Sequence, residues 1–259
     1  MNMMKETEHV FRLIVPFSNI FTTVYLVKTE DGALLFDAAT YPSDFEEHIQ
    51  PFLAELGVEP KDLKYLFISH NHEDHNGTIA EIFAAYPNLT LVARSPKIPE
   101  KYPEIPLLCP DETTELLRVL RCVPIPGHSR DSCALLDTRT NTLISGDCLQ
   151  LYGIYGSGKW GANISLIDEH FNALAQLEAM EINLILTAHD YHPMGYKYIG
   201  KEEILAELRN CRESLLKIAE LIRENPALTD AEIVDTYCTL NYPTPAEHVV
   251  RAVRQYFEK

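Results

Sequence analysis

The strongest constraint in this sequence is the run SHNHEDHNG at positions 69–77, which directly follows a short apolar run. Three imidazoles and two carboxylates lie within six positions of it, and these groups bind zinc, iron or manganese. Alternate residues that leave a strand end can point into one space, so His70 and His72 are expected to share a metal. Asp74 and His75, past the bend, are expected to face a second metal.

Two coordination spheres need more ligands than this run holds, so further ligands are expected at the ends of other strands. His128 follows a Pro-Gly turn, and Asp147 and His189 each follow an apolar run and a small residue. A rigid scaffold can hold a loop residue in a fixed place at such positions. These three residues complete the set of candidate ligands.

On these residues the chain resembles the metallo-β-lactamase superfamily of hydrolases, over roughly positions 11–195. The family has seven ligands in a fixed order, and the matching residues here are His70, His72, Asp74, His75, His128, Asp147 and His189. The resemblance implies that one metal takes His70, His72 and His128, that the other takes Asp74, His75 and His189, and that Asp147 bridges them. It implies two divalent ions, with zinc expected and iron or manganese as alternatives. A lone histidine would be interpreted as an ordinary core or surface residue, but seven matches in order favour the metal site.

The resemblance extends to two residues that are not ligands. Asp37 matches a family aspartate that supports the metal loop, although a turn-capping Asp fits the sequence equally well. Tyr191 resembles a tyrosine that glyoxalase II-like thioesterases use beside the substrate, and a packed aromatic residue at a strand end is the alternative. Asp74 is expected to orient the nucleophile as well as to bind metal, so Asp74 and Tyr191 are the predicted catalytic residues.

A stretch rich in glycine and aromatic residues, 150–163, follows Asp147. We interpret it as a lid over the metals, in which Tyr152 and Trp160 offer apolar contact and Lys159 offers a charge for a substrate carboxylate. An ordinary packed loop is the alternative interpretation.

The expected fold class is α/β. Strands are expected at 11–15, 21–28 and 33–36, with a hairpin turn at 30–32, and a further strand at 116–123. The repeated pattern of strands with ligands at their ends suits the four-layer αββα sandwich that the family has. Residues 1–200 are expected to form this domain, and residues 201–259 a C-terminal helical extension.

Four helix starts can be located from local signals. An amphipathic helix is expected over 165–180. Capping boxes at Ser43–Glu46, Thr229–Glu232 and Thr244–Glu247 predict three others, the last with Pro245 at the first helical position.

Composition limits the partners. The chain has 259 residues, 46% of them apolar, enough for a large core, and a net charge of -16 that repels nucleic acid and anionic membrane surfaces. Six scattered cysteines and the lack of a signal peptide or a long apolar run favour a reduced, cytoplasmic protein. A homo-oligomer is compatible with the sequence.

The sequence therefore predicts a metallohydrolase whose metal-bridging hydroxide attacks a carbonyl ester, a thioester or a lactone, of a small molecule. An iron-dependent persulfide dioxygenase is an alternative, because it would use the equivalents of His70, His128 and Asp147. RNA or DNA processing is disfavoured by the acidic charge, and a binding protein without activity is disfavoured by the full ligand set.

Overall fold

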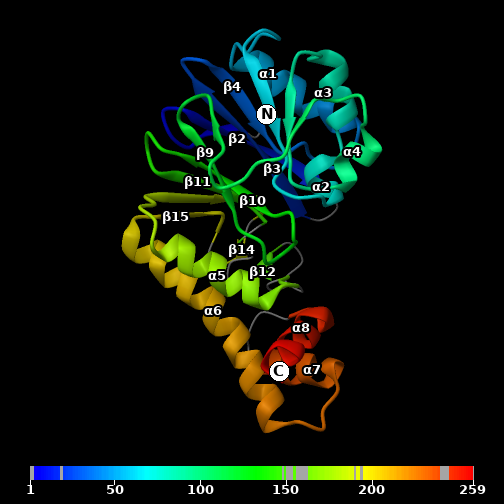
Figure 1. Ribbon diagram of the computed structural model, residues 1–259, viewed down its shortest axis with the longest axis vertical. Coiled ribbons are helices and arrows are strands. Elements are labelled where there is room, and N and C mark those ends of the chain that lie inside the picture. The colour runs from blue at the N-terminus through cyan, green and yellow to red at the C-terminus, as the bar shows by residue number, and fades with distance from the viewer. Residues whose placement is uncertain are drawn as a thin grey trace. The chain divides into compact units, whose positions relative to one another are not determined.

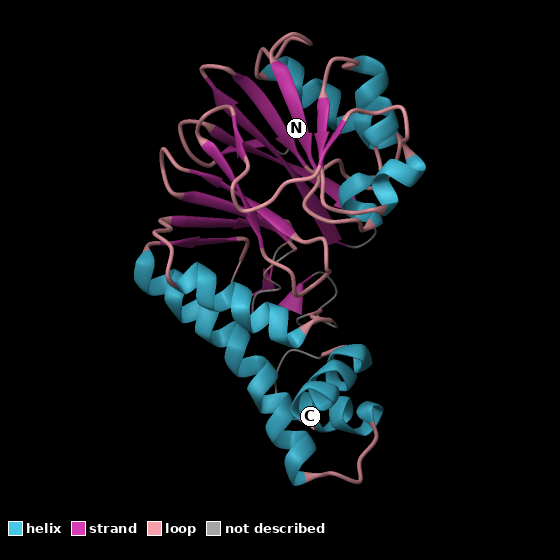
Figure 2. Cartoon of the chain, viewed as in Figure 1, coloured by secondary structure: helices cyan, strands magenta, loops and turns pink. Residues whose placement is uncertain are grey.

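The computed structural model describes residues 3–17, 20–147, 149, 154–155, 163–189, 191–192, 195–239 and 245–258. The chain forms two compact units (Figures 1 and 2). The first unit holds residues 1–124 and 133–139, and the second holds residues 125–132 and 140–259.

The first unit is built on a seven-stranded sheet whose strands follow one another in chain order. The first four strands pair antiparallel and the last three add in parallel. The strands are β1 (Met3–Lys5), β2 (Val10–Phe17), β3 (Ile20–Thr29), β4 (Gly32–Phe36), β5 (Leu63–Phe67), β6 (Thr90–Val92) and β7 (Leu107–Leu108). The three strands expected at the start of the chain are therefore confirmed.

The hairpin between β3 and β4 depends on Gly32, whose φ of 137° is a backbone conformation that other residues rarely adopt. Helices α2 (Glu73–Asn76), α3 (Ile79–Ala85) and α4 (Lys97–Lys101) belong to this unit. Residues from the sheet and from these helices, such as Leu35, Leu66 and Ile82, share one buried apolar cluster.

A helical segment begins at residue 43, as the capping box at Ser43–Glu46 predicted, but the box itself is wrong. Asp44 takes the cap position instead, and its carboxylate accepts hydrogen bonds from the backbone N–H groups of Thr40 (3.0 Å) and Tyr41 (2.8 Å). A π-helical turn, Phe45–Ile49, comes first, and α1 (Gln50–Glu55) follows with a proline in its first turn. Because proline has no N–H to donate, Pro51 suits the point where the π-helical turn passes into α1 and the hydrogen-bonding pattern changes.

The expected strand over 116–123 is wrong as a single element. It is a tight hairpin between β8 (Glu115–Leu116) and β9 (Leu120–Pro124), because Leu117 and Arg118 have φ of 48° and 60°. Left-handed backbone at two successive residues is typical of a hairpin turn. Strand β10 (Cys133–Asp137) pairs antiparallel with β9.

In the second unit, β11 (Thr142–Gly146) and β13 (Leu184–Thr187) run parallel, and β15 (Lys197–Ile199) pairs antiparallel with β13. Helix α5 (Ile167–Glu178) lies within the range 165–180 predicted for it. Three helices follow: α6 (Lys201–Glu224), α7 (Asp230–Thr239) and α8 (Glu247–Phe257).

Two of the helix starts in this unit differ in outcome. The box at Thr229–Glu232 is confirmed, since the Glu232 carboxylate accepts from the Thr229 N–H and hydroxyl, both at 2.8 Å. At α8, Ala246 is the cap residue and Pro245 lies before the helix, so Pro245 is not at the first helical position as predicted. Thr244 is outside the described residues.

The C-terminal helices share a buried apolar cluster with α5 and with Ile164. The boundary predicted between residues 200 and 201 coincides with the start of α6. Helix α6 contacts α5 and β15, which lie before that boundary. The division into a domain and an extension stays a prediction. Among the described helices, none is both long and apolar enough to cross a membrane.

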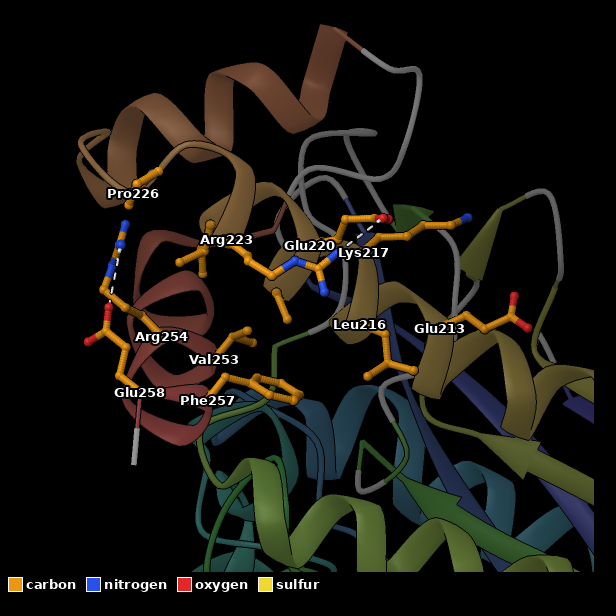
Figure 3. Close-up of a pocket in the computed structure, with 12 residues that line it drawn as sticks. Glu213, Leu216, Lys217, Glu220, Arg223, Pro226, Val253, Arg254, Phe257 and Glu258 are labelled. Atoms are coloured by element: carbon orange, nitrogen blue, oxygen red, sulfur yellow. Dashed lines mark ion pairs between the residues drawn. The ribbon is translucent and has the colours of Figure 1, made fainter.

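A cavity of about 750 Å³ opens between α6 and α8, with Leu216, Val253 and Phe257 on its walls (Figure 3). None of the seven candidate metal ligands, all of which the structure describes, is among the residues that line it. We therefore treat it as separate from the candidate site.

A buried carboxyl group in α6 generates a first prediction. Burial raises the pKa of Glu207 from 4.5 to about 7, so the folded chain keeps a proton that the unfolded chain releases. The folded state therefore loses stability as the pH rises from 4.5 to 7. Glu207→Gln, which resembles the protonated form, should raise the free energy of unfolding by about 2 kcal/mol at pH 8.

Urea unfolding at pH 8 and at pH 5 measures this effect, which should shrink at the lower pH. Glu202→Gln, an exposed residue of the same helix, is the matched control. A variant at position 207 that is less stable than the parent at pH 8 would contradict the argument.

Candidate metal centre

The first group of predicted ligands lies at the carboxyl end of β5, where the chain leaves the sheet. His70 and His72 occupy the loop after the strand, and Asp74 and His75 lie in the single turn of α2. The backbone N–H of His75 donates to the carbonyl of His72 at 3.1 Å, which closes the bend. The sequence run thus becomes a compact loop and turn rather than a longer helix.

His70 and His72 face each other. His70 Nε2 lies 2.9 Å from His72 Nδ1, and the two rings are nearly perpendicular at 78°. Donor nitrogens of the two imidazoles therefore point at the same place, as the alternation predicted. Asp74 and His75 meet in the same way, with His75 Nε2 3.4 Å from the Asp74 carboxylate.

Asp37 is the buried centre of this loop. Its carboxylate accepts hydrogen bonds from the backbone N–H of Ser69 (2.8 Å), the hydroxyl of Ser69 (3.0 Å) and Nδ1 of His75 (2.7 Å). Burial raises the pKa of the Asp37 carboxyl, against the opposing effect of His75 and Ser69. Its φ of 63° places it in the left-handed region, directly after β4.

The Ser69 hydroxyl extends this arrangement to His70. Since its one proton is donated to Asp37, its oxygen accepts from His70 Nδ1, 3.0 Å away. His70 and His75 thus both carry their proton on Nδ1, which leaves Nε2 to bind a metal.

Gly77 closes the loop by a close approach of backbones. A Cβ at this position would lie 1.9 Å from the carbonyl oxygen of Thr40. A side chain cannot be accommodated there without moving the backbone, so the glycine of the motif has a packing reason.

In the second unit, β11 and β13 are parallel, so their carboxyl ends lie at one edge. Asp147 follows β11 and His189 follows β13. One oxygen of the Asp147 carboxylate is 3.0 Å from His189 Nε2, and the other is 4.0 Å from His128 Nε2. The two oxygens of this carboxylate thus face two different imidazoles.

His128 is fixed in the same manner as His70 and His75. Its Nδ1 donates to the backbone carbonyl of Asn163 at 2.6 Å, so Nε2 faces Asp147. The preceding Gly127 packs against His170 of α5, and a Cβ there would be 2.7 Å from His170 Nδ1. Burial is the main reason that the pKa of His170 falls to about 3, so this imidazole is neutral.

Sequence reasoning missed His170 and Asn163. His170 carried a signal, because it lies three residues after Ile167 and four before Leu174 on the buried face of α5. Asn163 carried none, since the hydrogen bond uses its backbone carbonyl, which every residue has.

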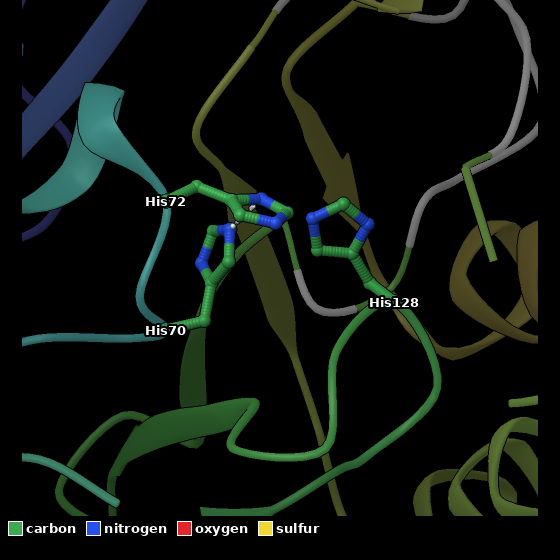
Figure 4. A group of neighbouring side chains, drawn as sticks. All are labelled: His70, His72 and His128. Carbon is green, nitrogen blue, oxygen red and sulfur yellow. Dashed lines mark hydrogen bonds between the residues drawn. The ribbon is translucent and has the colours of Figure 1, made fainter. Parts of the chain in front are cut away.

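The donor atoms form two groups. Within each group, every donor atom lies within 4.8 Å of the others. The first group is His70, His72 and His128 (Figure 4). The second is Asp74, His75, Asp147 and His189. Imidazole and carboxylate donors, with three of the imidazoles held by their other nitrogen, fit a divalent transition metal.

The predicted substrate residues stay untested. Tyr152, Lys159 and Trp160 lie outside the described residues. The backbone of Tyr191 forms β14 (Tyr191–His192), which pairs with β12 (Ile154–Tyr155), but its side chain is not described.

Among known proteins, the chain matches one family over most of its length. Residues 19–189 match the model of the metallo-beta-lactamase superfamily. The uncharacterized protein YobT of Bacillus subtilis is 30% identical over 163 residues, which cover 52% of this chain and 66% of that protein. The atrochrysone carboxyl ACP thioesterase AacuM of Aspergillus aculeatus is 22% identical over 225 residues, which cover 83% of this chain and 66% of that protein.

A crystal structure of a metallo-beta-lactamase family protein from Thermus thermophilus has the same fold, with a TM-score of 0.73 and 16% identity. The match covers 98% of this chain and 94% of that one. The expected fold class is therefore confirmed: mixed α/β with two main sheets and C-terminal helices.

The contacts of Asp37 generate a prediction about metal binding. In Asp37→Asn, an amide group replaces one carboxylate oxygen and meets N–H or O–H donors. The orientation of His70 and His75 should be lost, and zinc affinity should fall by about 10- to 100-fold. Competition with a chromophoric chelator measures the affinity.

Asp44→Asn is the matched control, because Asp44 is also a buried acceptor of backbone N–H groups but contacts no imidazole in the described hydrogen bonds. Equal zinc affinities for the two variants would contradict the role assigned to Asp37.

Proposed function

Because the chain belongs to the metallo-beta-lactamase superfamily, we propose that it is a metal-dependent hydrolase acting on a carbonyl ester of a small molecule. The observation that carries the proposal is Asp147, whose two carboxylate oxygens face His189 and His128 separately. A pair of divalent ions, with zinc as our first choice, fits this carboxylate and the imidazoles around it.

The proposed metal ligands are the seven residues of the sequence motif. His70, His72 and His128 would hold one ion, and Asp74, His75 and His189 the other, with Asp147 between them. Bound metal supplies a water of lowered pKa and a Lewis acid for the carbonyl oxygen of the substrate.

Asp74 is the ligand best suited to act on the attacking water. Its side chain keeps 15% of its surface exposed, whereas His75 beside it is fully buried. A carboxylate at the solvent side of the group can accept a hydrogen bond from water and orient it. We propose that Tyr191 donates its hydroxyl proton to the oxyanion or to the leaving group.

A thioester is our preferred substrate class. AacuM and several other relatives are named as ACP thioesterases, and a lactone is the second choice. Tyr152, Lys159 and Trp160 are proposed to contact the substrate. Cytoplasmic location and assembly into a homo-oligomer stay predictions.

The bridging role of Asp147 can be tested directly. Asp147→Ala should lose both metals, because each ion would lose a ligand, and hydrolysis of a model thioester should fall by about 100-fold or more. Elemental analysis and a thiol-release assay measure the two effects. Asp168→Ala, an exposed aspartate of α5, is the control.

Two outcomes would overturn the proposal. One is retention of two metals and normal turnover in Asp147→Ala. The other is a single iron in the parent protein, together with oxygen consumption on a persulfide, which would favour the dioxygenase.

A further inference from the structure

The hydrogen bond that orients His128 comes from a segment tied to that loop at several points. The carbonyl of Asn163 accepts from His128 Nδ1 at 2.6 Å. The backbone N–H groups of Ser165 and Leu166 both donate to the carbonyl of Gly127, at 3.0 and 2.9 Å. Three hydrogen bonds thus join residues 163–166 to the Gly127–His128 loop.

Asn163 also reaches the C-terminal helices. Its side-chain oxygen Oδ1 forms a hydrogen bond with Nε2 of His248, a residue 85 positions later in the first turn of α8. An amide oxygen can only accept, so His248 Nε2 is the donor. The backbone of Asn163 therefore holds His128, and its side chain is held by α8.

Helix α8 is itself fixed by packing and charge. Val249, Val250 and Val253 are completely buried in the apolar cluster that also contains Ile164, the neighbour of Asn163. Arg254 pairs with Asp230 of α7 at 3.0 Å. A helix with a packed, buried face holds its side chains in place more firmly than an exposed loop does. Helix α8 can therefore hold the side chain of Asn163 through His248.

We propose that His248 and Asn163 are positioning residues for His128, so that the C-terminal helices hold one side of the metal centre. The inference rests on the proposed function in one respect, which is that His128 binds a metal. Partners that orient a ligand tune its metal affinity, and their loss commonly costs about 10- to 100-fold.

The test compares variants at position 248 in the full-length protein. His248→Ala should weaken zinc binding by about 10-fold. This is the lower end of the usual range, because His248 acts on His128 only through Asn163. The visible spectrum of the cobalt-substituted protein should also change, since the His128 ring is less constrained. His248→Gln, whose amide can still donate to Asn163, should restore both properties.

Asn163→Ala removes the same hydrogen bond from its other end while keeping the backbone carbonyl and α8. It should match His248→Ala, and the double variant should be no weaker than either, because all three lose one interaction. This variant also decides the question if His248→Ala fails to fold. Gln255→Ala, an exposed residue of α8, is the control for changes in the helix.

Zinc affinity and a cobalt spectrum in His248→Ala and Asn163→Ala that equal those of Gln255→Ala would overturn the inference. That result, with Asp147→Ala still losing its metals, would remove the positioning role alone. Retention of both metals in Asp147→Ala would instead remove the proposed function.

Discussion

The metal loop of the first unit depends on the buried carboxylate of Asp37. A buried charge is costly unless its hydrogen bonds are satisfied, and Asp37 satisfies them with a backbone N–H, a hydroxyl and an imidazole. Two of these donors belong to Ser69 and the third to His75. Because the Ser69 oxygen in turn accepts from His70, one acidic group sets the proton position on two imidazoles. The left-handed backbone of Asp37 is maintained by the same contacts.

In the second unit, the imidazole of His128 is oriented by a different kind of acceptor. His128 donates to a neutral backbone carbonyl, whereas His75 donates to a carboxylate. A negative acceptor makes the opposite ring nitrogen more basic than a neutral one does. The Nε2 atoms of His75 and His128 therefore differ in basicity although the residue type is the same.

The sequence predicted most of what is local. The candidate ligands of the first unit are close in sequence. The others follow a Pro-Gly turn or an apolar strand, so spacing and position along the chain were enough to single them out. The box at Thr229 was also found because its partners are three residues apart. The capping contacts predicted at Ser43 are wrong because the adjacent Asp44 accepts from the backbone N–H groups of Thr40 and Tyr41 instead. Those contacts depend on the path of the chain before the helix, which the sequence pattern does not give. Contacts made by common groups at long range could not be predicted: the bond between Asn163 and His128 uses a backbone carbonyl, and the one between Asn163 and His248 spans 85 positions.

His170 is a buried histidine that lies beside the Gly127–His128 loop but belongs to neither group of candidate ligands. Its place on an apolar helix face indicated burial, but not the histidine loop that it supports. Neither of its ring nitrogens has a hydrogen-bond partner among the described residues, and burial lowers its pKa to about 3. The ring therefore stays neutral at physiological pH, whereas a protonated imidazole at this place would repel a bound cation. Burial on α5 thus keeps this ring uncharged beside the Gly127–His128 loop, and the ring packs against Gly127.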